Sequence, residues 1–419
     1  MRGLAKNEPG PAMLDVEAVR AQFPLLSDAA GRRGLCYLDN AATSHKPRAV
    51  LEAMDDCYRH EYGPVHRGLY ALAERATARY EQARAAVARF IGAPSADQLI
   101  FTRSATEAIN AVATGWAEPR LRPGYQVWVS RLEHHSNFLP WQRVCQRTGA
   151  QLRIIELRAD GRLDFESVAD LYGPRTRLIA LAQVSNVLGT ITPIREVVEQ
   201  ARAHGIPVLV DAAQSVAHGP VNVAELGCDF LAFSAHKIGG PTGIGALYAR
   251  AEHLEAMEPW LVGGGMVDEV GDSRSNWAPY PAKFEAGSPN LAGAIGFAAA
   301  VDFLAGIGME RVRDHVQALT QQALRALAAI PDIQIHGPAE ATGRAGIVAF
   351  NLRGVHPHDV AQLLAERGVA IRAGHHCCQP LMRFLGVPAT ARASFALYNR
   401  PDDVDVFNEA IHWARRVLI

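Results

Sequence analysis

Ser234, His236 and Lys237 end an apolar run, and the stretch that contains them, SAHKIGGPTGIG (residues 234–245), continues with four glycines and a proline. The glycines allow other backbone or a ligand to approach closely. A lysine that is partly desolvated near another cation has a lowered pKa and becomes an amine nucleophile, as a Schiff base with an aldehyde requires. The alternative is an ordinary solvated lysine at a strand end.

Asp211 ends the apolar run PVLVD, and Gln214 follows three residues later. A carboxylate at the bottom of a cleft can hold a proton on a heteroaromatic nitrogen, which is the task of the pyridinium partner in pyridoxal phosphate enzymes. An aspartate at this place could equally be a helix N-cap. One strand, one connection and a second strand separate Asp211 from Lys237, so both side chains could reach one cavity.

The stretch RSATEAIN (residues 103–110) predicts a turn from a strand into a helix. The hydroxyl groups of Ser104 and Thr106 and the free N–H groups of a helix start would form a seat for a phosphate. An ordinary capping box, with Ser104 or Thr106 as the cap, is the competing interpretation.

Two histidines and two cysteines adjoin one another in IRAGHHCCQPLM (residues 371–382). Four adjacent residues cannot surround a tetrahedral zinc ion, so we predict no metal site. Polar neighbours argue against two buried, inert thiols. A thiol beside His375, His376 and Arg372 would ionise more easily, and the thiolate is the reactive form. A Cys/His hydrolase could use such a pair, but it would leave Lys237 and Asp211 unexplained.

Charge and apolar content narrow the function classes. The 419 residues carry 42 Lys and Arg against 43 Asp and Glu, without the basic footprint of a nucleic-acid-binding protein. The N-terminal residues lack the apolar core of a signal peptide, which predicts a cytoplasmic location. The apolar stretch 291–309 contains Asp302, so we predict a buried helix and no membrane span, which would need ~20 apolar residues. Six cysteines without paired spacing indicate reduced thiols.

Short apolar runs alternate with amphipathic stretches from about residue 35 to residue 250. This pattern predicts an α/β fold whose mostly parallel sheet is covered by helices on both sides, with ligands beyond the carboxyl ends of its strands. The predicted strands are 35–39, 98–102, 126–130, 177–184, 207–211 and 229–234. After Met309 the pattern predicts a smaller α+β domain. We therefore divide the chain into an N-terminal segment (1–30) that packs with the small domain, a large domain (31–300), and a small domain (301–419) that carries Cys377.

Ten motifs occur in an order that is similar to that of a known family. They are LDNAATSHKP, PVHRGLYALAERAT, SATEAIN, LEHHSNFLPW, VSNVLGT, VDAAQS, SAHKIGGPTGIG, FEAGSPN, RAGHHCCQPLM and RASFALYN. Together they resemble the group II cysteine desulfurases, sulfur-mobilising members of the class V aminotransferases, from about residue 20 to the C-terminus. The resemblance implies the fold-type I architecture, with a seven-stranded sheet in the large domain, and a homodimer with its sites near the subunit interface.

The resemblance also implies that the protein binds pyridoxal 5'-phosphate (PLP). Lys237 would be the Schiff-base lysine and the acid/base for the substrate's α-proton, Asp211 would pair with the pyridine nitrogen, and His134 would stack on the ring. The other implied contacts, to the ring hydroxyl and the phosphate, are Ala105, Thr106, Asn186, Gln214, Ser234, His236 and, from the other subunit, Ser288. Ala105 replaces a small polar residue of the family and would act through its N–H group.

For the substrate, the resemblance implies that Arg392 clamps the carboxylate, a bidentate task suited to guanidinium. Asn186, His66 and Arg372 would be further substrate contacts, although Pro64 stands where the family usually has asparagine near His66. Cys377 would be the nucleophile that accepts sulfur. Its neighbour Cys378 could share the persulfide, form a disulfide or only pack, and we favour packing.

The implied reaction converts L-cysteine to L-alanine and leaves a persulfide on Cys377. A sulfur-acceptor protein, SufE-, SufU- or CsdE-like in the family, would collect that sulfur for iron-sulfur cluster or other sulfur-compound assembly. A selenocysteine lyase or a cysteine sulfinate desulfinase of the same PLP family is the alternative, because the same lysine chemistry serves all three. A PLP-free hydrolase and a silent scaffold for sulfur-transfer partners also stay open.

Overall fold

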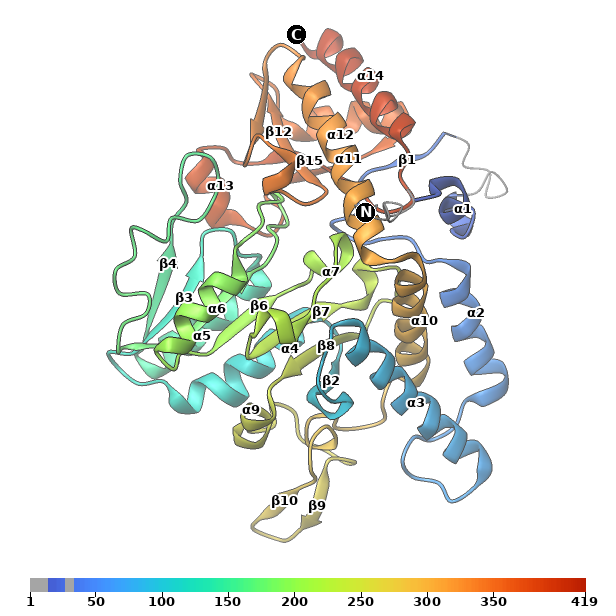
Figure 1. Cartoon of the computed structure of the whole chain (residues 1–419), viewed down its shortest axis with the longest axis vertical. Helices are drawn as coiled ribbons and strands as arrows, with labels where there is room; N and C mark the ends of the chain where they lie inside the picture. Colours follow the sequence, from blue (N-terminus) through green and yellow to red (C-terminus); the bar gives the residue numbers. More distant parts are fainter. Residues whose placement is uncertain (1–13, 27–33) are drawn as a thin grey trace, which may run out of the picture.

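A seven-stranded sheet forms the centre of the computed structural model, which describes residues 14–26 and 34–419 (Figure 1). Its strand order is β2-β8-β7-β6-β5-β3-β4, and only β8 runs antiparallel to its neighbours. The strands are β2 (Leu99–Thr102), β3 (Gln126–Ser130), β4 (Gln151–Ile155), β5 (Thr176–Ala182), β6 (Val208–Asp211), β7 (Phe230–Ser234) and β8 (Gly245–Ala249). The predicted mostly parallel α/β sheet is confirmed.

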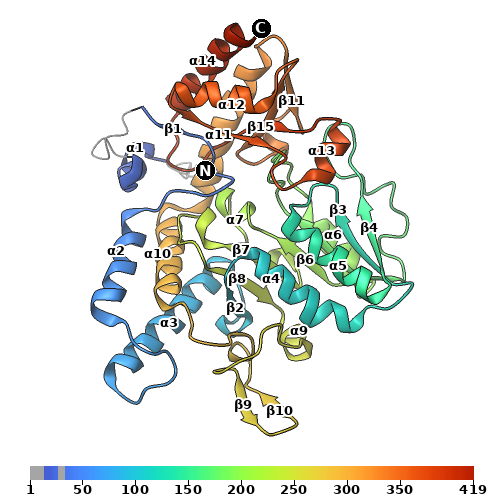
Figure 2. The same ribbon diagram turned by 180° about the vertical axis from the view of Figure 1, so that it is seen from behind.

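Both faces of this sheet are buried because successive side chains point to opposite sides. Val127 and Val129 belong to a core with α4 (Ala105–Ala111) and α5 (Leu139–Thr148), the face turned to the viewer in Figure 2. Trp128, between them, belongs to the opposite core with α6 (Ile194–Ala203), α3 (Ala71–Phe90) and α10 (Leu291–Ile307). Apolar residues at successive positions of these strands therefore pack against helices on one face of the sheet or the other.

A second, four-stranded antiparallel sheet lies at the top of Figure 1, in the order β11-β12-β15-β14. Its strands are β11 (Ile333–His336), β12 (Ile347–Leu352), β14 (Arg372–Gly374) and β15 (Thr390–Ser394), and helices α11 (Met309–Ala328), α12 (Pro357–Glu366) and α14 (Pro401–Leu418) pack against it. A boundary at residues 300/301 would fall inside α10, and Gly308 separates α10 from α11. The division into domains stays a prediction.

The predicted packing of residues 1–30 lies partly outside the described residues, which exclude 1–13 and 27–33. Within the described part, α1 (Val16–Arg20) contacts the residues around the start of α14. The Arg20 guanidinium donates to the carbonyl of Tyr398 at 3.0 Å and lies 3.5 Å from the Asp403 carboxylate.

The structure differs from the sequence-based prediction at the run 35–39. Only β1 (Cys36–Tyr37) is a strand there, and it pairs in parallel with β13 (Val369–Ala370) and not with the seven-stranded sheet. The run is short, and its backbone continues along the small sheet, where Leu38 accepts a hydrogen bond from Ser394 N. The prediction that residues 35–39 form a strand of the large sheet was therefore wrong.

Helix α10 contains most of the apolar stretch 291–309, and most of its residues are buried. In the ranges 14–26 and 34–419, no single helix has the length and apolar content to cross a membrane. The pair α10 and α11 meets that test only when taken together, across a bend of 77°.

A buried ion pair connects α3 to the seven-stranded sheet. The Arg84 side chain is 1% exposed and contacts both carboxylate oxygens of Glu285, at 2.5 and 2.8 Å. Glu285 also accepts hydrogen bonds from Phe101 N in β2 and from the Tyr80 hydroxyl. The buried Arg84 guanidinium has further hydrogen bonds to Glu81 and to the Leu99 carbonyl, as expected for a buried charge.

Replacing Arg84 with alanine is expected to lower the free energy of unfolding by about 3–5 kcal/mol, because a buried carboxylate loses its counter-ion. Denaturant unfolding followed by circular dichroism measures this. Arg59→Ala is the control, since the Arg59–Asp55 pair is 66% and 61% exposed; it should leave the midpoint unchanged. Equal midpoints for Arg84→Ala and the parent protein would contradict the assigned role.

Candidate active site

A cavity of about 330 Å³ lies beyond the carboxyl ends of the central strands. His134 follows β3, Asn186 follows β5, Asp211 ends β6, and Lys237 ends the short 3₁₀ helix (Ala235–Lys237) after β7. Parallel strands place their carboxyl ends at one edge of a sheet, so the polar residues that follow them converge. The small sheet closes the other side of the cavity.

The structure brings twelve of the predicted site residues to this cavity. They are Ala105, Thr106, His134, Asn186, Asp211, Gln214, Ser234, His236, Lys237, Arg372, Cys377 and Arg392. Two predicted residues lie elsewhere: exposed Ser288 lines a separate hollow beside Trp260, and exposed His66 lines another beside Arg67. The supply of Ser288 by a partner subunit stays a prediction, and His66 does not reach the cavity of its own chain.

Lys237, which is half-buried, and Asp211, which is buried, both line the cavity. Burial lowers the pKa of Lys237 to about 8, although the negative charge of Asp211 acts in the opposite direction. Burial likewise raises the pKa of Asp211, opposed by Lys237 and by the hydrogen bond from Ala213 N at 2.9 Å. The amine is therefore partly neutral near pH 8, when it can act as a nucleophile or a base.

His134 presents a neutral ring to the cavity wall. Burial and the nearby charge of Lys237 lower the pKa of His134 to about 3. Its Nδ1 accepts a hydrogen bond from Ser136 N at 3.1 Å and lies 2.9 Å from the Ser136 hydroxyl. The preceding Glu133 is buried, and it accepts hydrogen bonds from Ala182 N in β5 and from the Asn137 amide. These contacts fix the ring next to the sheet edge.

Hydroxyl and N–H groups gather at the start of α4. Ala105 N donates to Ser234 Oγ at 2.8 Å, and the Thr106 and Ser136 hydroxyls lie 2.7 Å apart. His236 Nδ1 lies 3.2 Å from Thr43 Oγ1, and burial lowers the pKa of His236 to about 4. Ser104 is the N-cap of this helix, so the capping and phosphate-seat interpretations are compatible. The group is suited to a tetrahedral anion.

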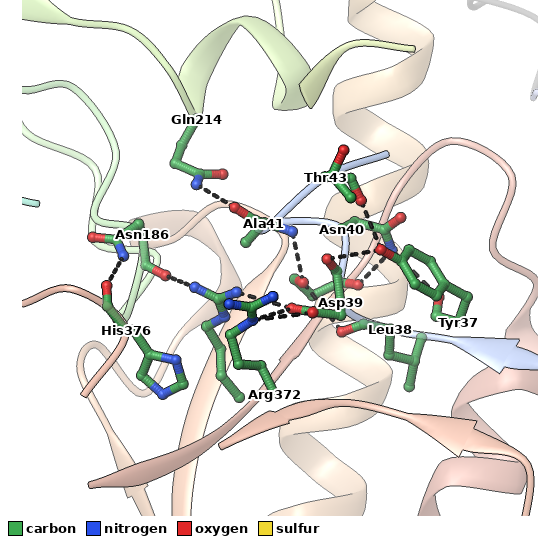
Figure 3. Close-up of polar contacts among 12 residues, drawn as sticks. Tyr37, Leu38, Asp39, Asn40, Ala41, Thr43, Asn186, Gln214, Arg372 and His376 are labelled. Atoms are coloured by element: carbon green, nitrogen blue, oxygen red, sulfur yellow. Dashed lines mark hydrogen bonds and ion pairs between the residues drawn. The ribbon is translucent and has the colours of Figure 1, made fainter. Parts of the chain in front are cut away.

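Several buried polar atoms around the cavity have no hydrogen-bond partner among the residues that the structure describes. They are Asn186 Oδ1, Gln214 Oε1, His376 Nδ1 and Arg392 Nε. The amide nitrogens of Asn186 and Gln214 are occupied, since they donate to the carbonyl groups of His376 and Ala41 at 2.8 Å each (Figure 3). Buried polar atoms are rarely left unsatisfied, so these atoms point to a polar ligand.

The loop after β14 carries the two adjacent cysteines in opposite environments. Cys377 is exposed, whereas Cys378 is fully buried and its thiol donates to the carbonyl of Glu133 at 3.1 Å. Both thiols are free. The expectation that neither cysteine is buried was therefore right for Cys377 and wrong for Cys378, and the packing interpretation of Cys378 is confirmed.

A left-handed backbone conformation turns Cys377 out of this loop. His376 and Cys377 have φ values of 52° and 53°, which non-glycine residues rarely adopt. Hydrogen bonds hold the turn, since His135 N donates to the Cys377 carbonyl at 2.8 Å. The His376 ring lies against Thr390 at 3.0 Å, and burial lowers its pKa to about 3, so His376 adds no positive charge beside Cys377.

Sequence reasoning missed the contribution of residues 39–43 to the site. Ala41 and Thr43 line the cavity, and the Asp39 carboxylate contacts both Arg372 and Arg392 at 3.0 Å (Figure 3). The motif LDNAATS contains these residues and supplied the available signal. The sequence alone assigned no role to residues 39–43, because the strand before them is only two residues long. So short a strand does not show which edge of a sheet the residues after it will reach.

The family model for aminotransferase class-V matches residues 36–407. A probable cysteine desulfurase of Halalkalibacterium halodurans is 48% identical over 95% of this chain and 97% of its own length. A cysteine desulfurase of Salmonella agona is 47% identical over 93% and 96%. The chain belongs to the aminotransferase class-V family.

Solved structures agree with this assignment. The cysteine desulfurase CsdA of Escherichia coli superposes with a TM-score of 0.89 and 43% identity, over 97% of this chain and 100% of that one. A cysteine desulfurase of Thermococcus onnurineus, solved in its apo form, gives a TM-score of 0.91 and 38% identity, over 97% and 99%. The fold-type I architecture is confirmed.

The lowered pKa of Lys237 predicts how this amine titrates. In cofactor-free protein, its acylation by acetic anhydride, followed by peptide mass spectrometry, should rise with a midpoint near pH 8, because only the neutral amine reacts. Asp211→Asn removes the charge that raises this pKa and should move the midpoint to lower pH. A midpoint near 10.5, the ordinary value for lysine, would show that the amine is not desolvated.

Proposed function

We propose that this chain is a PLP-dependent cysteine desulfurase that converts L-cysteine to L-alanine and retains the sulfur as a persulfide on Cys377. One observation carries the proposal: a half-buried amine, Lys237, and an exposed thiol, Cys377, line the same cavity together with the buried guanidinium of Arg392. A hydrolase would have no use for Lys237 and Asp211 at that place. The relatives named cysteine desulfurases, at 47–48% identity, support the same activity.

The residues of the cavity fit PLP. Its volume of about 330 Å³ suits a small cofactor with a bound amino acid. Lys237 offers an amine for the aldehyde, and Asp211 offers a carboxylate for the pyridine nitrogen. The unpartnered oxygens of Asn186 and Gln214 are available to a ring hydroxyl, and the donors at the start of α4 would hold the phosphate. When bound, PLP supplies an electron sink for the electron pair at the substrate's α-carbon.

The residues of the chain then divide the reaction between them. Lys237, which is partly neutral near pH 8, takes the proton from the substrate's α-carbon. Asp211 would keep a proton on the pyridine nitrogen of the bound cofactor, and the neutral ring of His134 would lie against it. Arg392 orients the substrate through its carboxylate. The Cys377 thiolate attacks the substrate sulfur, so that an S–S bond forms on the protein as the Cβ–S bond of the substrate breaks.

Delivery of the sulfur requires an acceptor that reaches Cys377. This residue is exposed and lines the cavity, which suits transfer to a protein acceptor. That acceptor would serve iron-sulfur cluster or other sulfur-compound assembly in the cytoplasm.

We further propose a homodimer, because Ser288 lies outside the cavity of its own chain. A partner subunit would bring Ser288 to the phosphate.

Borohydride reduction tests the cofactor assignment. The protein with PLP should be yellow, and reduction should fix a pyridoxyl group on the peptide that contains Lys237, as peptide mass spectrometry can show. Lys237→Ala should lose both the adduct and alanine formation, because no other amine lies in the cavity among the described residues. A parent protein that stays colourless after incubation with PLP would reject the assignment.

The two adjacent cysteines supply a matched pair of variants. Cys377→Ala should lower alanine and sulfide formation from L-cysteine under reductant by about 100-fold or more, since the nucleophile is lost. Cys378→Ala should keep activity within about threefold, because the Cys378 thiol is buried away from the cavity and its loss is a packing change. Retained turnover in Cys377→Ala would overturn the role of this thiol.

A further inference from the structure

Two arginines face each other directly across neighbouring strands at the cavity. Arg372 in β14 and Arg392 in β15 are cross-strand partners. The Arg392 side chain is only 3% exposed, and that of Arg372 is 49% exposed. Like charges directly opposite one another destabilise a sheet. This pair therefore needs a counter-ion, most of all on the buried side.

Asp39 is that counter-ion. Its carboxylate lies 3.0 Å from Arg372 Nε and 3.0 Å from Arg392 Nη2, so it bridges both guanidinium groups (Figure 3). In the described ranges it is the only carboxylate within salt-bridge distance of either arginine. Burial lowers the pKa of Arg392, and Asp39 opposes this effect. The negative charge of Asp39 thus maintains a buried cation beside the cavity.

The backbone fixes Asp39 independently of its carboxylate. Ser394 N donates to the Leu38 carbonyl at 2.7 Å, and Ala41 N donates to Ser394 Oγ at 2.9 Å. Both flanking residues are therefore fastened to β15, the strand that carries Arg392. A change of charge at position 39 can be made without removing these contacts.

The three charges leave one positive charge for a ligand. Arg392 Nη1 donates to the carbonyl of Asn186 at 2.8 Å, whereas its Nε has no partner in the described part of the chain. Arg372 uses its Nε for Asp39, and within residues 14–26 and 34–419 its terminal nitrogens form no hydrogen bond or ion pair. Two guanidinium groups and one carboxylate sum to a single positive charge, which balances the negative charge of one substrate carboxylate.

We propose that Asp39 is a specificity-determining residue, which limits the arginine pair to one net positive charge and so favours amino acids with a single anionic group over those with a second anionic group on the side chain. The inference rests on the proposed function for its substrates. L-Cysteine, whose thiol is neutral when protonated, belongs to the favoured class. L-Cysteine sulfinate, with an anionic side chain, belongs to the disfavoured class.

Removing the charge of Asp39 raises the net charge of the pair from one to two. A second anionic group on the ligand then meets an uncompensated guanidinium a few ångströms away. At the effective dielectric of a partly exposed site, one unit charge at this range changes relative affinity by about tenfold. A purely structural role for Asp39 would instead weaken both kinds of ligand equally and leave their ratio unchanged.

Two independent ratios test the proposal. The first is kcat/KM for L-cysteine sulfinate divided by kcat/KM for L-cysteine, with alanine as the product measured for both. The second is the affinity of the cofactor-free protein for succinate divided by its affinity for propionate, measured by calorimetry. Asp39→Asn should raise each ratio about tenfold. Asp39→Glu, which keeps the charge, should retain the parent ratios.

Further variants control for folding and for charge in general. Arg372→Gln removes one guanidinium and should shift both ratios in the opposite direction, which tests the idea even if Asp39→Asn does not fold. Asp332→Asn removes a charge from the surface pair with Arg415 and should change neither ratio. If the parent turns over neither substrate but Asp39→Asn still raises the succinate ratio, the proposed function fails and the role of Asp39 stands. Unchanged ratios in both Asp39→Asn and Arg372→Gln would overturn that role.

Discussion

The attachment of residues 38–44 to both sheets is the constraint on which the site depends. On one side, Leu38 and Ala41 are hydrogen-bonded to Ser394 in β15. On the other side, Ala41 accepts a hydrogen bond from the Gln214 amide, and Ser44 N donates to the His236 carbonyl. The segment thereby places the arginines of the small sheet opposite the strand ends that carry Asp211 and Lys237. Without it, neither sheet alone forms the cavity.

Much of the large sheet could be predicted because burial on both faces leaves a simple trace in the sequence. Apolar runs such as PVLVD have no polar alternation, and a polar residue stands where each run ends. Helix α3 lacked such a trace: its buried face consists largely of alanines and includes Arg84, whose charge is satisfied by Glu285. Strand β4 was also missed, because its residues are mostly exposed or half-buried and so do not form an apolar run.

In the candidate site, too, the sequence predicted the features that depend on neighbouring residues and missed those that depend on residues far away in the chain. The strand-end positions of Asp211 and Lys237 follow from the strands themselves, so their convergence was predictable. Asp39 was not, because its partners Arg372 and Arg392 are more than 300 residues away in the chain. The different burial of Cys377 and Cys378 could not be read from their shared neighbours either, since it arises from the φ values of the loop.

The hydrogen bond from His135 N to the Cys377 carbonyl joins two parts of the cavity wall. His134, which lines the cavity, immediately precedes the donor His135, and the acceptor is Cys377, the residue proposed to receive the sulfur. A swing of the loop toward an outside partner therefore has to break this bond and release one edge of the wall. An acceptor protein that docked on this loop and moved it would therefore also free the backbone next to His134, so that docking outside would be felt at the cavity wall.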